Sequence, residues 1–188
     1  MNQNELWDQV YRKDAVTWRG NTIVPFPVKG TALDLGCGNG KTTSSLIDAR
    51  YHVIGIDFST VAIDHCKKTF QDSEFFVSDV TSLPLEDSSV DYVTAVHLIE
   101  NLDDDQLSDM VSEISRVLKP GGYVFIRSFT ERDMRSKKRH DSDIRYIFRD
   151  VDVLTKAFGN FGLVSAELKD EPTRFGTLRS RIEILVKK

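Results

Sequence analysis

The sequence predicts a doubly wound α/β fold, in which a mostly parallel sheet carries helices on both faces. Between residues 31 and 128, short apolar runs alternate with segments of helical periodicity, and such strand–helix–strand connections produce parallel strands. A glycine-rich turn at residues 36–40 follows the first apolar run and opens the first of these helices. The chain length of 188 residues fits one domain with its own hydrophobic core.

Each element is predicted from its local pattern. Residues 4–13 carry apolar side chains at helical spacing, and glycine and proline punctuate an extended arm at 20–30. The helix over 103–118 has the clearest apolar stripe, and Pro-Gly-Gly at 120–122 is expected to end it. Strands are predicted at 31–36, 52–57, 74–78, 90–96 and 123–128, with further helices at 41–50 and 59–70.

The last part of the chain follows a different pattern. Residues 129–149 are rich in charge and lack strong periodicity, whereas 151–161 is predicted to be helical. Strands at 163–169 and 181–186, joined by a short link, are predicted to close the sheet as an antiparallel pair. The single domain 1–188 would then comprise an N-terminal helix and arm (1–30), a core (31–128), a candidate substrate loop (129–149) and a C-terminal helix with the closing strands (150–188).

Charge and cysteine content narrow the functional classes. The net charge of −4 gives no support to general polyanion binding. Cys37 and Cys66 form neither a disulfide framework nor a metal-ligand cluster, so we expect no disulfide, no metal and a reducing compartment. The first residues lack the apolar core of a signal peptide, and no apolar run approaches the length of a membrane span. We therefore expect a cytoplasmic protein without a membrane partner.

The motif with the most chemical content is Asp-Leu-Gly-Cys-Gly-Asn-Gly at residues 34–40. Its glycines permit positive φ and let a ligand approach the main chain, and the carboxyl end of a strand is where open α/β sheets bind ligands. The third glycine of a dinucleotide fingerprint would fall at Lys41, which argues against NAD and FAD, and no P-loop is present. The alternative is an ordinary strand-to-helix turn.

A second candidate is Asp57, the last residue of the second predicted strand. A carboxylate at that position can accept hydrogen bonds from both hydroxyls of a ribose. The alternative is an acidic residue that the dipole of the following helix favours.

Four stretches resemble the class I S-adenosylmethionine-dependent methyltransferases: ALDLGCGNG, VIGIDFS, the acid in SDVTSLPLEDSSVDYV, and ISRVLKPGGYVFI. They occur in the order typical of that family over residues 31–128. The resemblance implies a seven-stranded sheet of order 3-2-1-4-5-7-6 with the last strand antiparallel. It also implies S-adenosylmethionine as cofactor and S-adenosylhomocysteine as product.

The resemblance assigns roles along the cofactor. The turn would cradle the methionine moiety through Gly36, Cys37, Gly38 and Gly40, with Asp34 behind it helping to hold the ammonium group. Val96 and His97, at the end of the fourth strand, would line the methionine and face the acceptor.

At the adenosine end, the resemblance implies that Asp57 binds the ribose and that Phe58 packs near the adenine. Asp79 would accept from the adenine amino group, and the backbone amide of Val80 would meet a ring nitrogen. Two alternatives stay open, namely that Phe58 is a core residue and that Asp79 is a turn residue.

The N-terminal arm resembles the lid of small methyltransferases of the thiopurine and tellurite-detoxifying types through Trp7, Tyr11 and Trp18. In those relatives such residues help to cover the cofactor. The alternative is that Trp7 and Tyr11 form the buried stripe of a docking helix.

On the acceptor side, His97, Glu100 and His140 are the candidates for a general base. Residues 96–99 read Val-His-Leu-Ile, so the Asn-Pro-Pro-[Tyr/Phe] signature of amino-methylating nucleic-acid enzymes is absent there. Within the charged loop, Arg145 and Tyr146 are predicted to contact an anionic or polar acceptor near His97, because arginine binds carboxylate or phosphate bidentately. The alternative is a solvated connection.

Three functions follow from these observations. The first is methyl transfer to a small-molecule acceptor. The second is methylation of RNA or protein, for which the basic run at 137–140 could provide contacts. The third is a regulatory protein that binds S-adenosylmethionine without catalysis.

Overall fold

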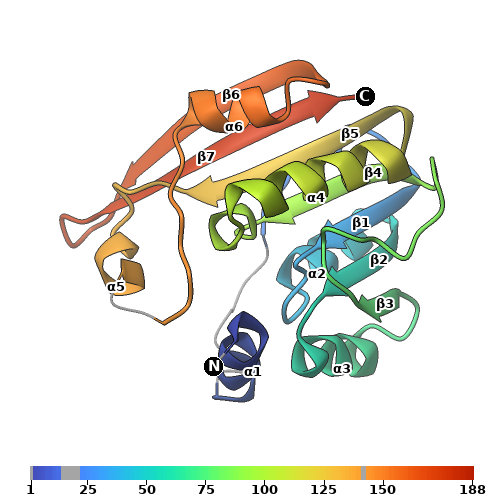
Figure 1. The fold of residues 1–188 in the computed structure, drawn as a ribbon, viewed down its shortest axis with the longest axis horizontal. Helices are drawn as coiled ribbons and strands as arrows, with labels where there is room; N and C mark the ends of the chain where they lie inside the picture. The colour runs from blue at the N-terminus through green and yellow to red at the C-terminus, as the bar shows by residue number, and fades with distance from the viewer. Residues whose placement is uncertain (1, 14–21, 141–142) are drawn as a thin grey trace.

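The computed structural model describes residues 2–13, 22–140 and 143–188, and the strands of this described part form one seven-stranded sheet. Its order is β3-β2-β1-β4-β5-β7-β6, in which β7 runs antiparallel to both β5 and β6, so the predicted topology is confirmed (Figure 1). The strands are β1 (Thr31–Leu35), β2 (His52–Asp57), β3 (Glu74–Val77), β4 (Val90–Val96), β5 (Leu118–Phe129), β6 (Gly162–Pro172) and β7 (Leu178–Lys187).

Helices cover both faces of this sheet, as the doubly wound fold requires. One face packs apolar side chains of α4 and α6 against the strands, and the other packs Leu46 of α2 with Val24 and Tyr92. Figure 1 shows α5 near the carboxyl end of β5 and α1 on the side of α3, which it contacts. The helical segments are α1 (Gln3–Lys13), α2 (Lys41–Asp48), α3 (Thr60–Thr69), η1 (Ile99–Asn101), α4 (Asp104–Val117), α5 (Ser136–His140) and α6 (Val151–Ala157).

Helix α4 shows how the local sequence specifies an element. The Asp103 side chain accepts from the Gln106 amide, and the Gln106 side chain accepts from the Asp103 amide, which together form a capping box. The apolar stripe that predicted this helix is buried against the sheet at Leu107, Met110, Val111, Ile114 and Val117. Cap and stripe therefore fix both the start of α4 and its orientation.

Several predicted boundaries were wrong, most of all the start of the fifth strand. The fifth strand begins at Leu118, before the Pro-Gly-Gly segment, because Leu118 pairs with Val90 and the register then shifts before Tyr92. The final hairpin is also longer than expected. Its pairing begins where Gly162 lies opposite Lys187 and continues to the point where Pro172 lies opposite Leu178. Tertiary pairing with a neighbouring strand extends these segments beyond their apolar stretches.

The charged segment 129–149 contains the short helix α5, which the sequence did not predict. The Asp133 carboxylate accepts from the backbone and side chain of Arg135 at the start of this segment and from the Ser180 amide of β7. These bonds attach the segment to the hairpin and place α5 beside the carboxyl ends of the strands.

Candidate active site

The glycine turn between β1 and α2 has the backbone that its sequence predicts. Gly36, Gly38 and Gly40 have φ of 63°, 52° and 84°, a region that other residues avoid. A Cβ at Gly40 would lie 2.3 Å from a ring carbon of Phe70, and one at Gly38 would lie 2.8 Å from the Tyr11 hydroxyl. Both positions therefore need glycine for conformation and for space.

Asp34 lies beneath this turn with 1% of its surface exposed. Its two carboxylate oxygens accept from the Thr43 hydroxyl at 2.7 Å and the Thr94 hydroxyl at 2.9 Å. Burial raises the pKa of Asp34 to about 6, although both hydroxyls act in the opposite direction. Asp34 thus joins β1, α2 and β4 directly behind the turn.

Asp57 ends β2 on the adjoining side of the turn. One carboxylate oxygen accepts from the Gly38 amide and the other from the Ser59 amide, each at 2.9 Å. Burial raises the pKa of Asp57 to about 6, and the nearby Asp8 carboxylate adds to the rise. The Asp57 side chain is therefore fixed in one orientation at the tip of the strand.

A cavity of about 90 Å³ adjoins Asp57. Its walls include Phe58, Asp79 and Val80, so the structure brings together the four residues predicted for the adenosine end. The Asp79 carboxylate accepts from the Thr81 amide and hydroxyl, which is the turn role given above as its alternative.

A larger cavity of about 620 Å³ opens on the other side of the turn. Gly36, Cys37 and Gly38 line it, together with Val96 of β4. The two cavities share four lining residues, Trp7, Tyr11, Gly36 and His97. The turn and these side chains therefore lie at the junction of the two spaces.

Helix α1 forms part of the wall of both cavities. Trp7 and Tyr11 stack with ring centroids 5.7 Å apart, and none of the residues of α1 is fully buried. The Ser59 hydroxyl donates to the Asp8 carboxylate, which attaches α1 to the start of α3. Trp7 and Tyr11 therefore face the two cavities, while Trp18 lies outside the described residues.

His97 and Glu100 occupy the floor of the larger cavity. The His97 backbone has φ of 59°, and its ring stacks on Phe129 with centroids 3.6 Å apart. The Ser128 hydroxyl donates to one oxygen of the buried Glu100 carboxylate, and the other oxygen lies 3.4 Å from Nδ1 of His97. Neither that oxygen nor Nδ1 has a hydrogen-bond partner among the described residues. His140 ends α5, and its side chain lies outside the described part of the chain.

The environment of His97 favours its neutral form. Burial lowers the pKa of His97, and the charges of Arg127 and Arg135 contribute to the fall, whereas Glu100 opposes it. A neutral imidazole beside an unpartnered carboxylate oxygen can accept a proton from a bound group and share the resulting charge with Glu100.

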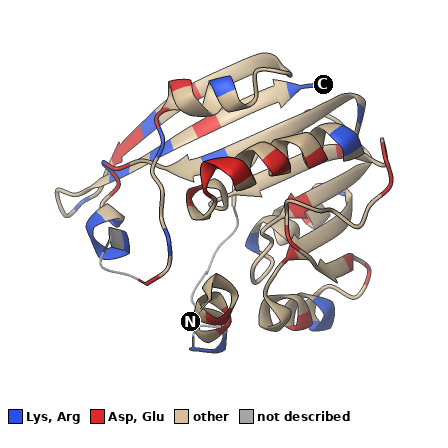
Figure 2. Ribbon diagram, in the orientation of Figure 1, with Lys and Arg blue, Asp and Glu red and all other residues tan. Residues whose placement is uncertain are grey.

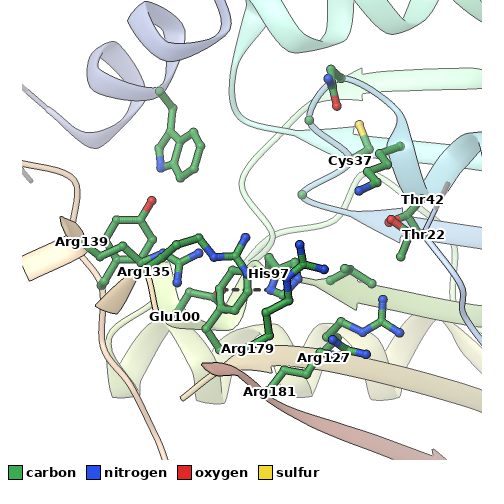
Figure 3. A pocket seen from close by; sticks show the side chains of 18 of the residues that line it. Thr22, Cys37, Thr42, His97, Glu100, Arg127, Arg135, Arg139, Arg179 and Arg181 are labelled. Carbon is green, nitrogen blue, oxygen red and sulfur yellow. Dashed lines mark ion pairs between the residues drawn. The ribbon is translucent and has the colours of Figure 1, made fainter. Parts of the chain in front are cut away.

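Cationic side chains form much of the remaining wall, and Figure 3 shows the labelled arginines gathered around His97. Arg135 and Arg139 lie in the predicted substrate loop 129–149, and Arg139 belongs to the basic run at 137–140, but no individual site role was predicted for any of these cations. Arg179 and Arg181 alternate along β7 and therefore share a face, a pattern that could have indicated them. The six are Lys41, Arg127, Arg135, Arg139, Arg179 and Arg181.

The predicted acceptor contacts lie on different sides of the turn. The Arg145 guanidinium donates to the Asn101 carbonyl and to the side chains of Asp103 and Gln106, and it lines the small cavity. Tyr146 lines the large cavity, with the Arg139 guanidinium 5.2 Å from its ring centroid. Contact of either residue with an acceptor stays a prediction.

A family model described as a methyltransferase domain matches residues 33–126, half of the chain. The chain belongs to the class I S-adenosylmethionine-dependent methyltransferases. The matched segment runs from β1 into β5 and contains the glycine turn, Asp57, Asp79 and His97. The cations on α5 and β7 lie beyond it.

Curated methyltransferases match parts of the chain. A phosphoethanolamine N-methyltransferase of Triticum aestivum is 33% identical over 142 residues, which cover 72% of this chain and 28% of that protein. A ubiquinone/menaquinone biosynthesis C-methyltransferase of Desulfotalea psychrophila is 35% identical over 119 residues, covering 61% of this chain and 46% of that protein. The chain thus spans less than half the length of these two relatives.

Solved structures share the fold at lower identity. A methyltransferase of Methanosarcina mazei aligns with a TM-score of 0.75 at 22% identity, covering 88% of this chain and 99% of that one. A methyltransferase of Archaeoglobus fulgidus aligns with a TM-score of 0.72 at 18% identity, covering 98% and 94%. The second alignment covers nearly the whole chain, so the shared fold includes the C-terminal hairpin.

Among the described helices, none is long and apolar enough to cross a bilayer. The described residues contain no cluster of three or more metal-ligating side chains, and Cys37 and Cys66 are both free buried thiols.

Proposed function

We propose that this methyltransferase transfers the methyl group of S-adenosylmethionine to a small-molecule acceptor and releases S-adenosylhomocysteine. The main observation that supports this proposal is the pair of cavities that meet at the glycine turn. The smaller one has the carboxylates of Asp57 and Asp79, and the larger one has a base and cations. A ligand that bridges the turn would present its reactive centre near His97, which lines both cavities.

The residues around the turn fit the cofactor in their chemistry. Asp57 has both oxygens oriented by backbone amides, and each oxygen keeps a lone pair for a ribose hydroxyl. Asp79 is an exposed acceptor beside the cavity, and the absence of a Cβ at Gly38 lets the Tyr11 hydroxyl of α1 approach the turn closely. Asp34 has both oxygens occupied by hydroxyls, so we assign it mainly to holding the turn.

The bound cofactor supplies a methyl group already activated on a sulfonium. The protein then has to orient the acceptor, exclude water and, where the acceptor is protonated, remove a proton. Orientation can contribute roughly 7–11 kcal/mol of a barrier. Trp7 and Tyr11 cover the junction of the cavities, and His97 with Glu100 is the base that the site offers.

The dimensions of the larger cavity support a small acceptor. Its volume of about 620 Å³ falls within the range of about 300–1,000 Å³ that small-molecule sites occupy. The names of the curated relatives, which refer to quinones and phosphoethanolamine, support the same class.

Calorimetric titration with S-adenosylmethionine, S-adenosylhomocysteine and NAD tests the cofactor. We expect the first two to bind and NAD not to bind. Asp57→Ala should weaken binding of S-adenosylhomocysteine by about 10- to 150-fold, since hydrogen bonds to a charged group contribute about 1.5–3 kcal/mol. Tight NAD binding without S-adenosylmethionine binding would contradict the proposal.

A methyl-transfer screen with labelled cofactor against small-molecule, tRNA and protein pools tests the acceptor. Label is expected in the small-molecule pool. Label confined to the tRNA or protein pool would show that the acceptor is a macromolecule and would contradict the proposed small-molecule acceptor. Cofactor binding with no label in any pool would favour a regulatory protein that binds the cofactor without catalysis.

A further inference from the structure

Positive charge is concentrated around the larger cavity, although the chain as a whole has a net charge of −4. Six Lys and Arg side chains line this cavity, against the carboxylates of Glu100 and Glu171. Figure 2 shows Lys and Arg positions on α5 and on β7. The concentration is local, so it concerns what enters the cavity and not what the whole surface attracts.

Four of the six cations form ion pairs with carboxylates that line the cavity or lie behind its lining residues. Arg127 lies 2.7 Å from Glu183, and Arg181 lies 2.8 Å from Glu171. Asp133 pairs with both Arg135 at 3.0 Å and Arg139 at 3.4 Å.

Two lining cations have no ion-pair partner within residues 2–13, 22–140 and 143–188. Lys41 begins α2 directly after the glycine turn, and Arg179 lies on β7 with its side chain exposed to the cavity. The pKa of Lys41 is lowered by burial first and then by Arg127, Arg135 and Arg179. These cations repel one another within one space, and an anion placed there would relieve the repulsion.

The cofactor does not supply that anion. S-adenosylmethionine carries a sulfonium and an ammonium against one carboxylate, so its binding adds net positive charge beside the cavity. Lys41 lies on the turn side, where it can meet the cofactor carboxylate, whereas Arg179 lies on β7, in the C-terminal hairpin. A negative group on the other substrate is therefore needed most on the β7 side.

We propose that the methyl acceptor carries a phosphate or carboxylate group and that Arg179 and Arg135 bind this group. The proposal rests on the proposed function and names its substrate class. The Arg179 guanidinium has no ion-pair partner among the described residues, and Arg135 uses Nε and one terminal nitrogen for Asp133, which leaves the other terminal nitrogen available. A planar guanidinium matches phosphate and carboxylate through paired N–H donors.

The wall also positions such an acceptor. The guanidinium carbons of Arg135 and Arg139 lie 4.3 and 3.6 Å from the centroid of the Phe129 ring. The His97 ring stacks on the same Phe129 ring. An anion on the arginines is thus held at a fixed separation from the candidate base. Figure 3 shows Arg135 and Arg179 directed toward the space beside His97.

Calorimetry on the full chain saturated with S-adenosylhomocysteine provides the direct test, with inorganic phosphate and succinate as separate probes. We expect one or both anions to bind, and the stronger probe indicates whether the natural group is phosphate or carboxylate. Arg179→Ala should weaken this binding by about tenfold or more, while Arg179→Lys should retain part of it.

Arg174→Ala is the matched control, because Arg174 lies in the turn that leads into β7, is exposed and does not line the cavity. We expect less than about a twofold change for this variant, since it loses the same charge outside the site. Equal binding by the wild type and Arg179→Ala, equal loss in both variants, or no binding of either anion would overturn the proposal.

The two proposals fail in different ways. If S-adenosylhomocysteine does not bind, the proposed function is wrong, and the anion titrations of the free protein still decide the present inference. If the labelled product of the small-molecule pool is identified by mass spectrometry, we expect it to contain a phosphate or carboxylate group. A product with neither group would overturn the anionic acceptor while leaving methyl transfer established.

Discussion

The two halves of the site carry opposite charge. On the β1–β3 side, the carboxylates of Asp34, Asp57 and Asp79 stand at or beyond strand ends. On the β5–β7 side, guanidinium groups from β5, α5 and β7 surround His97. The segment that matches the family model ends at residue 126 within β5, so it includes the three carboxylates and His97, whereas the guanidinium groups of the second half lie beyond it.

The halves also differ in rigidity. Asp34 and Asp57 are buried, and all four of their oxygens accept hydrogen bonds from the scaffold. By contrast, the Arg135 side chain is 38% exposed, and Arg179 has no ion pair within the described ranges. We infer a preorganised cofactor side and an acceptor side that becomes ordered when an anion binds.

The largest loss of stability is expected at Gly40, where an added side chain has no room. Gly40→Ala should reduce the free energy of unfolding by about 2–5 kcal/mol, from a left-handed backbone and overpacking against Phe70. Gly121→Ala is the control, because Gly121 also has positive φ but has no neighbour within 4 Å of the added Cβ. Urea unfolding measures both variants, and equal losses would show that the contact with Phe70 contributes nothing.

His97→Gln tests the link between the two halves. If the acceptor loses a proton, kcat should fall by about 100-fold, the lower end of what a general base contributes, while S-adenosylhomocysteine affinity is retained. The wild-type rate should also decline on acidification below pH 6.5, because the lowered pKa of His97 keeps it neutral above that value. His52→Gln, on the exposed start of β2, is the control. An unchanged kcat would exclude His97 as the base.

The raised pKa of the buried carboxylates predicts how the stability of the protein depends on pH. The pKa of Asp57 is raised from 3.8 to about 6, so the folded state binds its proton more tightly than the unfolded state. Asp57 therefore contributes more stability as pH falls from 7.5 to 4.5, by about 2 kcal/mol, relative to Asp57→Asn. Asp34 acts in the same direction, and His97 acts in the opposite direction below pH 6.5.

Urea unfolding of the cofactor-free protein at both pH values measures this difference. Asp79→Asn is the control, because Asp79 is exposed at the same edge of the sheet. A difference between the wild type and Asp57→Asn that does not change with pH would contradict the raised pKa.

The smallest effect is expected at Arg145. Its ion pair with Asp103 joins side chains that are 35% and 46% exposed, so Arg145→Ala should cost about 0.2–1 kcal/mol of stability. We expect the acceptor KM to change less than in Arg179→Ala, because the Arg145 guanidinium is already bonded to three groups. Steady-state kinetics of both variants decide this, and a larger rise in Arg145→Ala would favour Arg145 as the acceptor contact.

Much of the fold could be predicted from local patterns. The alternation of strands and helices, together with the family resemblance, predicted the strand order that the structure has. The early start of β5, the full length of the β6–β7 hairpin and the helix α5 could not be predicted. Each of them depends on pairing or bonding with residues far away in the chain, for which a local window has no signal.

The sequence by itself determined where the carboxylates of the proposed cofactor half lie, because these residues occur in chain order at the ends of successive parallel strands. Only the tertiary structure decided the acceptor half. There, the antiparallel register places Arg181 opposite Phe129 and Glu183 opposite Arg127. Side chains alternate between the faces of a strand, so a slip of one residue would turn Arg179 and Arg181 away from the cavity. The position of those charges is a property of the pairing between β5 and β7, which no local motif encodes.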